Sequence, residues 1–333
     1  MNKIHVLDCT LRDGGYVNDW KFGDDNSVNI VDLVSKSGVD YAELAFIRIC
    51  DYQKDKMEFS KMEQISDIFC PSQHNLAAMV EIGYGYPVDN FPLRSKSTVD
   101  LIRLVVWKRM IKESFAYAKA LLEKGYEVAI QATRTEQYTL EEFAEFARYF
   151  SQLDLKAIYI VDTFGLLTKD NLLKYALVLD ENLGKGICMG YHAHNNMQQA
   201  FSNMVAFCEH PWRHELIVDA SVMGIGRGAG NLCLELLEKY LNENFNSNYK
   251  EEMIYQCADM YIEPIFEKKS WGYSIPYLLS AKYGRNPSYV PLLCRMGLTF
   301  SQMAKVFSEM RIRNIGIRFN DSECTLLVKE VIG

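Results

Sequence analysis

Two histidines, His192 and His194, stand two residues apart at the end of an apolar run that starts at Ile187. Residues i and i+2 of a β-strand face the same side, whereas the same spacing on a helix makes them diverge. The polar residues that follow predict a buried strand ending at a polar mouth. Two imidazoles there suit a divalent cation, but the pair alone leaves a metal under-coordinated, so two core histidines are the alternative.

A third candidate ligand lies near the N-terminus. Arg12 and Asp13 come directly after the apolar run 4–7, and Gly14 and Gly15 break that run, so both charges fall just past a strand end. An aspartate offers a hard oxygen ligand, and a neighbouring arginine can stabilise an oxyanion on a bound substrate. A surface turn is the ordinary alternative for an isolated Arg-Asp-Gly sequence.

Four motifs in this order resemble the metal-dependent aldolase, lyase and acyltransferase superfamily. Its members include the 4-hydroxy-2-oxovalerate aldolases, hydroxymethylglutaryl-CoA lyase, and the isopropylmalate and homocitrate synthases. The motifs are Asp-Cys-Thr-Leu-Arg-Asp-Gly at 8–14, Glu43, His-Ala-His-Asn at 192–195, and the glycine-rich loop 224–231. The resemblance covers roughly residues 1 to 245 and is closest to the 4-hydroxy-2-oxovalerate aldolases.

The resemblance implies roles for individual residues. Asp13, His192 and His194 would hold the metal, and Asn231 would complete or support its shell, with capping of the following helix as the alternative. Arg12 would stabilise the enolate of a 2-oxo acid.

Two acidic residues receive roles in the same way. Glu43 would orient Arg12 or a water on the metal, and pairing with some other group on its strand is the alternative. Asp162 ends an apolar run at a position that the family places near the substrate, where it would act directly or as support.

The proton-transfer group is where the chain departs from the family. The aldolases carry a histidine shortly after Arg-Asp-Gly, and Tyr16 stands near that position here. A tyrosine is a poor base unless its pKa, about 10, is tuned, so Tyr16 either transfers protons or only shapes the pocket. Tyr273 resembles a tyrosine that the aldolases contribute from their C-terminal region, with ordinary packing as the alternative.

The loop glycines, Gly226 and Gly228 among them, would bind a substrate carboxylate or close over the site through backbone N–H groups. The loop lacks the Lys-Ser/Thr of a P-loop, which disfavours a nucleotide role.

These features predict a metal-dependent carbon–carbon lyase that cleaves or forms a 2-oxo acid aldol through a pyruvate-type enolate. Mn²⁺ or Mg²⁺ suits hard substrate oxygens best, while Zn²⁺, Co²⁺ or Fe²⁺ fits the same ligands. One alternative is an acyl-CoA condensing enzyme, although those synthases follow Arg-Asp-Gly with Glu-Gln rather than with a glycine and a tyrosine. The other is a catalytically silent barrel that serves as a binding subunit.

Composition narrows the class of protein. The 333 residues carry a net charge of −7 without a basic cluster, which disfavours nucleic-acid and acidic-membrane surfaces. No apolar run reaches a membrane span, no signal-peptide core follows Met1, and the nine cysteines form no paired framework. We therefore expect a cytoplasmic enzyme for a small-molecule substrate, with a homo-oligomer or a dehydrogenase docked on its C-terminal region as possible partners.

The elements that must position these residues recur along the chain. Eight apolar runs of strand length alternate with amphipathic helical segments, at residues 4–7, 39–46, 76–82, 99–107, 126–133, 157–162, 186–191 and 216–222. This count predicts an α/β fold of the (β/α)8 TIM-barrel type over residues 1–245. A doubly wound sheet is the alternative, but candidate residues at five different strand ends need a closed ring to converge.

The alternation stops near residue 245. We expect a mainly helical C-terminal extension over 246–333, with helices at 255–266, 277–283 and 300–310. The stretch 324–332 fits a helix or a strand.

Overall fold

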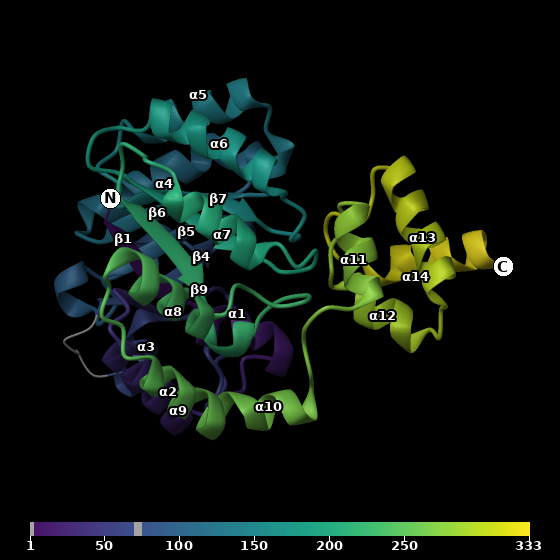
Figure 1. Cartoon of the computed structure of the whole chain (residues 1–333), viewed down its shortest axis with the longest axis horizontal. Helices are drawn as coiled ribbons and strands as arrows, with labels where there is room; N and C mark the ends of the chain where they lie inside the picture. The colour runs from purple at the N-terminus through teal and green to yellow at the C-terminus, as the bar shows by residue number, and fades with distance from the viewer. Residues whose placement is uncertain (1–2, 70–74) are drawn as a thin grey trace.

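The computed structural model describes residues 3–69 and 75–333. Eight parallel strands form a closed barrel in the order β1-β9-β8-β7-β6-β5-β4-β2, and β1 pairs with β2 to complete the ring. Figure 1 shows helices surrounding these strands. The strands are β1 (Ile4–Asp8), β2 (Tyr41–Ile47), β4 (Asn75–Glu81), β5 (Leu101–Val106), β6 (Glu127–Thr133), β7 (Ala157–Asp162), β8 (Cys188–Ala193) and β9 (Leu216–Ala220).

Each barrel strand overlaps one of the eight predicted apolar runs, so the TIM-barrel prediction is confirmed and the doubly wound alternative is wrong. Strands buried on both faces read as continuous apolar runs, which is why the sequence locates them well. The two-residue strand β3 (Glu58–Phe59), which pairs with the end of β2, was too short to predict.

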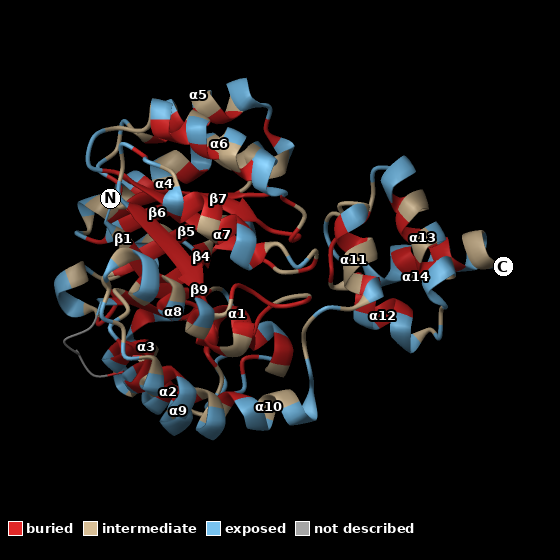
Figure 2. Ribbon diagram, in the orientation of Figure 1, coloured by how far each residue is buried: buried red, intermediate tan, exposed pale blue. Residues whose placement is uncertain are grey.

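The barrel helices are α1 (Thr10–Asn18), α2 (Asp24–Ser37), α3 (Met62–Ile68), α4 (Ile111–Glu123), α5 (Leu140–Phe150), α6 (Lys169–Asn182), α7 (Ala200–Glu209) and α8 (Leu234–Phe245). Short 3₁₀ turns lie at Ile82–Tyr84, Val88–Asn90, Arg94–Lys96, Lys108–Met110, Thr135–Gln137 and Val222–Gly224. A capping box opens α5, where the Thr139 hydroxyl accepts a hydrogen bond from the Glu142 amide. Figure 2 shows that buried residues concentrate in the strands and on the inner faces of these helices.

Helix α1 carries Arg12 and Asp13. Gly14 and Gly15, which were predicted to break the first apolar run, lie inside this helix. A Cβ atom on Gly15 would lie 2.0 Å from a carbon of the Trp20 indole, so only glycine allows Trp20 to pack there. The Trp20 Nε1 atom donates to the Arg12 carbonyl at 2.7 Å. This bond connects the segment after α1 to Arg12, which faces the barrel mouth.

The C-terminal region is helical, as predicted, but its helices have different neighbours. Helix α9 (Glu251–Cys257), a π-helical turn (Ala258–Ile262) and α10 (Glu263–Lys268) follow one another, and α9 packs on α2 and α8 of the barrel. Helices α11 (Ile275–Lys282), α12 (Tyr289–Arg295), α13 (Phe300–Ile312) and α14 (Asp321–Ile332) form a second body, here called the helical unit. The ambiguous stretch 324–332 belongs to a helix.

The helical unit has its own core, in which Leu293, Phe307 and Leu327 are buried, and Figure 1 shows it beside the barrel. The boundary at residue 245 between two domains stays a prediction. None of the helices in the described part of the chain has the length and apolar character of a membrane span.

Candidate active site

Strand β8 and helix α1 bring Asp13, His192 and His194 together at the C-terminal mouth of the barrel. One ligand atom from each of these buried side chains lies within 4.8 Å of the others. The His194 Nε2 atom is 3.4 Å from the Asp13 carboxylate. The i, i+2 spacing on a strand therefore places both imidazoles on one point, and the carboxylate arrives from the first βα unit.

Each imidazole is oriented by its other nitrogen. His192 Nδ1 lies 2.8 Å from the Asp219 carboxylate, and His194 Nδ1 lies 3.0 Å from the backbone carbonyl of Asp162. An Nδ1–H donor in these bonds leaves Nε2 with a free lone pair, as metal-binding histidines require. The buried Nε2 of His194 has no hydrogen-bond partner among the described residues. These residues fit a divalent cation.

The pKa shifts agree with this fit. Burial lowers the pKa of His192 and so favours its neutral, ligating form. Burial alone would raise the pKa of Asp13, but the Arg12 guanidinium and the two imidazoles hold it well below its usual range. The site thus offers one carboxylate and neutral imidazole nitrogen to a cation.

Asn231 lies beside this cluster because its backbone forms an antiparallel bridge with His194. Its Nδ2 donates to the Ile225 carbonyl at 3.1 Å, while its Oδ1 is buried without a partner in the described chain. It does not cap a helix at Leu232, since α8 begins at Leu234.

The glycine-rich loop closes against the cluster. A Cβ atom on Gly226 would lie 2.4 Å from the Asn231 Nδ2 and 2.8 Å from an Asp13 carboxylate oxygen. The next amide, of Arg227, donates to Asp13 at 3.3 Å. Gly228 adopts a φ of +70°, and its neighbour Ala229 donates to Asn196 rather than facing a ligand. The loop glycines therefore allow close packing on the cluster.

Behind the cluster lies a chain of buried charges. Arg12 donates from Nε to Glu43 at 2.7 Å and from Nη1 to Asp13. Arg103 on β5 donates to the same Glu43 oxygen at 2.8 Å and also to Asp219. Asp219 in turn holds His192, so Glu43 links the two halves of one network. The Arg12 Nη2 atom has no partner among the described residues.

Within this network, opposite charges keep Arg12, Arg103 and Asp219 ionised. Burial would lower the pKa of Arg12 and Arg103 and raise that of Asp219, but the opposite charges around each group reverse the direction. The pKa is raised for both arginines and lowered for Asp219.

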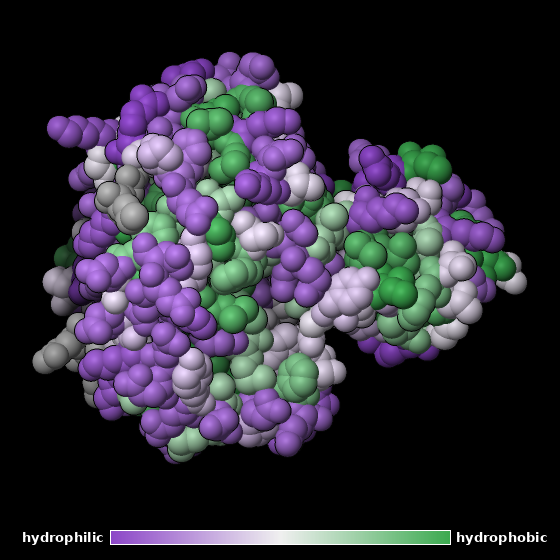
Figure 3. All heavy atoms as spheres, in the orientation of Figure 1, coloured by the Kyte–Doolittle hydropathy of each residue, from purple (hydrophilic) through white to green (hydrophobic). Residues whose placement is uncertain are grey.

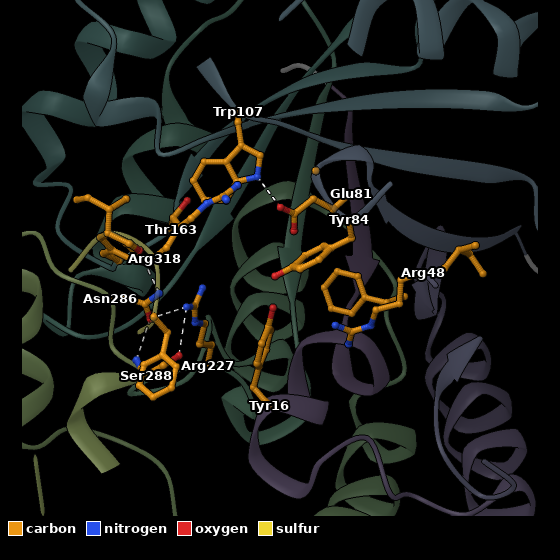
Figure 4. Close-up of a pocket in the computed structure, with 16 residues that line it drawn as sticks. Tyr16, Arg48, Glu81, Tyr84, Trp107, Thr163, Arg227, Asn286, Ser288 and Arg318 are labelled. Atoms are coloured by element: carbon orange, nitrogen blue, oxygen red, sulfur yellow. Dashed lines mark hydrogen bonds between the residues drawn. The ribbon is translucent and has the colours of Figure 1, made fainter. Parts of the chain in front are cut away.

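Two adjoining cavities open above this network. The inner cavity, of about 90 Å³, is lined by Arg12, Asp13, His192 and His194. The outer cavity, of about 470 Å³, lies between the barrel mouth and the helical unit. Six residues line both: Tyr16, Phe46, Glu81, Trp107, Thr163 and Arg227. Figure 4 shows the outer cavity with side chains pointing into it from both bodies.

Tyr16 stands where the two cavities meet. Its ring makes an edge contact with Trp20 at a centroid distance of 4.8 Å, and the Arg227 guanidinium lies 5.3 Å from its centre. Loss of water around the phenol raises the pKa of Tyr16, and Arg227 opposes this only in part. The sequence analysis did not predict Arg227 beside Tyr16. Because the pKa of the phenol is raised even with this cation nearby, Tyr16 is still poorly suited to act as a base.

Two predicted site residues do not line either cavity. The Asp162 carboxylate accepts hydrogen bonds from the amides of Leu166 (2.8 Å) and Leu167 (3.0 Å), so it supports the loop after β7. Burial raises the pKa of Asp162 to about 7. Tyr273, in the connector between α10 and α11, is 55 % exposed and is not among the residues that line the two cavities.

Sequence reasoning missed Arg103, Asp219, Gln131 and Glu81. The first three are polar side chains in otherwise apolar strands. The sequence could have identified them, because a polar residue in a barrel strand indicates either a buried partner or a side chain that faces the barrel interior. Glu81 ends β4 and lines both cavities; burial raises its pKa, and Trp107 Nε1 donates to it at 2.6 Å.

The structure is a parallel barrel with a carboxylate–imidazole cluster at the C-terminal ends of its strands. TIM-barrel enzymes have their active sites at this end of the barrel, and the side chains of this cluster are of the kinds that bind metals. The sequence matches the HMGL-like family over residues 3–260. The chain belongs to this family.

Proteins that are similar to this chain support the assignment to this family. The 4-hydroxy-2-oxovalerate aldolase of Geobacillus genomosp. 3 is 24 % identical over 272 residues, which cover 79 % of this chain and 78 % of that protein. The oxaloacetate decarboxylase of Mycobacterium tuberculosis is 22 % identical over 246 residues, covering 70 % and 68 %. A variant of the carboxyl transferase domain of Rhizobium etli pyruvate carboxylase shares the fold at a TM-score of 0.73 and 15 % identity, over 100 % of this chain and 62 % of that one. The chain is thus a lyase-type enzyme of the HMGL-like family.

Proposed function

We propose that this enzyme cleaves or forms a carbon–carbon bond in the aldol of a 2-oxo acid such as pyruvate. The observation that carries the proposal is the convergence of Asp13, His192 and His194 beside Arg12, whose Nη2 atom is buried without a partner. A cation and a free guanidinium donor at one point suit a substrate that develops negative charge on oxygen.

Asp13, His192 and His194 would hold a divalent cation, with the free Oδ1 of Asn231 completing or supporting the shell. Such a cation supplies Lewis-acid stabilisation of charge on the substrate oxygens. Mn²⁺ or Mg²⁺ is our choice because a 2-oxo acid presents hard oxygens, while Zn²⁺, Co²⁺ and Fe²⁺ fit the same ligands.

In the cleavage direction, a base takes the proton of the aldol hydroxyl, the carbon–carbon bond breaks to release an aldehyde, and the electron pair forms an enolate. Arg12 would donate to the enolate oxygen while Glu43 fixes the guanidinium plane through its 2.7 Å bond.

We assign the proton transfer to Glu81, because it is a carboxyl that lines the inner cavity and its pKa is raised by burial. Tyr16 would shape the cavity mouth. Gly226 and Gly228 would contribute by letting the loop close on the site, and a direct role for Asp162 or Tyr273 in the reaction lacks support from their positions.

Two further features stay proposals. A cytoplasmic location agrees with the absence of disulfides among the eight cysteines in the described residues. A homo-oligomer or a dehydrogenase partner would use the helical unit, where Figure 3 shows hydrophobic atoms at the surface and where Ile312 and Leu326 are 74 % and 67 % exposed.

A turnover assay tests the proposal against its rivals. Purified enzyme is stripped of metal, reloaded with Mn²⁺ or Mg²⁺, and assayed for pyruvate release from 4-hydroxy-2-oxo acids and for CoA release from acetyl-CoA with 2-oxo acids. Metal-dependent pyruvate release supports the aldolase. CoA release would instead identify a condensing enzyme, and a loaded protein inactive in both assays would indicate a binding subunit.

A further inference from the structure

The outer cavity is built by two bodies. Arg48, Glu81 and Trp107 reach it from the barrel, and Asn286, Ser288 and Arg318 reach it from the helical unit, as Figure 4 shows. The cavity adjoins the inner one through shared walls, so a substrate whose reacting end lies at the metal cluster would extend its other end outward.

Arg227, on the glycine-rich loop, is held by the helical unit. Its Nη2 atom donates to the Asn286 Oδ1 at 2.6 Å and to the Ser288 hydroxyl at 3.3 Å. Its Nε atom is buried and has no hydrogen-bond partner in the described chain. The two contacts orient the guanidinium but leave its charge without a carboxylate.

Arg318 adds a second cation. Its guanidinium carbon lies 5.8 Å from the Trp107 ring centre, which places it against the cavity wall. Within residues 3–69 and 75–333, neither Arg227 nor Arg318 forms an ion pair with an acidic side chain. Arg48 differs, since it pairs with Glu58 and lies 4.7 Å from the centre of the Trp20 ring.

The only acidic side chain lining the outer cavity among the described residues is Glu81, and its pKa is raised by burial. Three arginines but only one carboxyl therefore line this cavity, in a chain with a net charge of −7. A concave site with this charge balance concentrates anions. Two unpaired guanidinium groups on its wall are suited to bind a carboxylate or a phosphate through charge-assisted hydrogen bonds.

We propose that the outer cavity binds an anionic group, carboxylate or phosphate, on the aldehyde half of the substrate, with Arg227 and Arg318 as its ligands. This inference rests on the proposed aldolase function and names its substrate class. The enzyme then prefers acceptor aldehydes with an anionic tail to neutral aldehydes of the same length, and the helical unit sets that preference.

The test compares matched aldehydes in the addition of pyruvate. Succinic semialdehyde is compared with butanal, and glyceraldehyde 3-phosphate with glyceraldehyde, by kcat/KM. We expect the anionic member of at least one pair to be preferred by roughly 10–100-fold, the range of one charged hydrogen bond. The pair with the larger ratio distinguishes a carboxylate from a phosphate.

The Arg318→Gln variant should reduce that ratio by a similar factor, and Arg318→Lys should recover part of it. Arg295→Gln is the matched control, because it removes an exposed charge from α12 outside the cavity and should keep the parental ratio. Equal kcat/KM values within both pairs would overturn the inference while leaving the aldolase function intact.

If no aldehyde reacts, the proposed function fails and the anion site is judged separately. Binding of inorganic phosphate to metal-free protein is then measured by calorimetry. Binding by the parent and Arg295→Gln, with loss in Arg318→Gln, supports the site. Equal binding by all three proteins, or none by the parent, contradicts it.

Discussion

The inner and outer cavities of this enzyme adjoin, yet their charges are arranged in opposite ways. In the inner cavity, Arg12 and Asp13 belong to a closed network in which each charge meets an opposite one. In the outer cavity, Arg227 and Arg318 line the wall and have no carboxylate partner among the described residues. The inner cavity is lined by residues of the barrel alone, whereas the outer wall combines barrel and helical unit.

This difference indicates where chemistry and recognition lie. A buried network in which each charge meets an opposite one keeps its geometry without a ligand, because removing any member leaves a charge unpaired at a cost of several kcal/mol. An accessible, unpaired cation instead gains its partner only when a ligand arrives. The inner cavity is thus suited to hold a fixed reaction centre, and the outer one to select among substrates.

The largest expected effect comes from removing a metal ligand. Asp13→Asn or His194→Ala should abolish tight binding of Mn²⁺ and all turnover, because the cation loses one of three ligands. Elemental analysis after dialysis measures this, with circular dichroism to check folding. His210→Ala is the control, since that histidine stacks on Trp212 outside the site. If the ligand variants kept the metal content of the parent, the proposed metal site would be refuted, and so would the comparison between the two cavities.

The second prediction separates two candidates for proton transfer. Glu81→Gln should lower kcat by about 10²–10⁴, the usual contribution of a positioned acid or base, whereas Tyr16→Phe should change it little. Both variants keep the shape of the side chain, so each removes one titrating group. Steady-state kinetics across pH 6–9 gives the result. A reversed pattern, with the tyrosine variant inactive but still loaded with metal, would transfer the role to Tyr16.

A third, smaller effect concerns Arg12. Arg12→Ala should reduce kcat by about 10²–10³, the effect of losing one oxyanion donor. Arg12→Lys should restore only part of the rate, because lysine lacks the planar fork that meets Glu43 and Asp13 together. Single-turnover rates at saturating substrate, with metal content as the control, provide the measurement. If the alanine variant turns over normally, Arg12 is structural only.

The sequence predicts the inner cavity better than the outer one for a physical reason. His192 and His194 converge through strand geometry alone, and the eight apolar runs reflect strands buried on both faces. The bond between Arg103 and Asp219 joins residues 116 positions apart, and no local pattern encodes it. The outer cavity depends on how the helical unit docks, which explains why the sequence singled out Tyr273 rather than Asn286 or Arg318.

The last prediction tests whether a buried carboxyl group stays ionised, as Asp219 of the inner network does, when no opposite charge lies beside it. Glu238 on α8 is as buried as Asp219, but its partner is the neutral Ser37 hydroxyl at 2.5 Å rather than an arginine. Burial accordingly raises the pKa of Glu238 to about 7, whereas that of Asp219 is lowered.

A carboxyl with a raised pKa in the folded state binds its proton more tightly there than in the unfolded chain. Folding stability from Glu238 is therefore present at acid pH and falls between about pH 4.5, the unfolded value, and about pH 7, the folded one. Glu238→Gln keeps the bond to Ser37 without a titrating charge, so its melting temperature should exceed the parent's by a few degrees at pH 8 and match it at pH 4.5. Thermal melts at both pH values measure this. A difference in melting temperature that is the same at both pH values would show that Glu238 stays ionised or finds a cationic partner. Burial without an opposite charge would then not be what distinguishes Glu238 from the inner network.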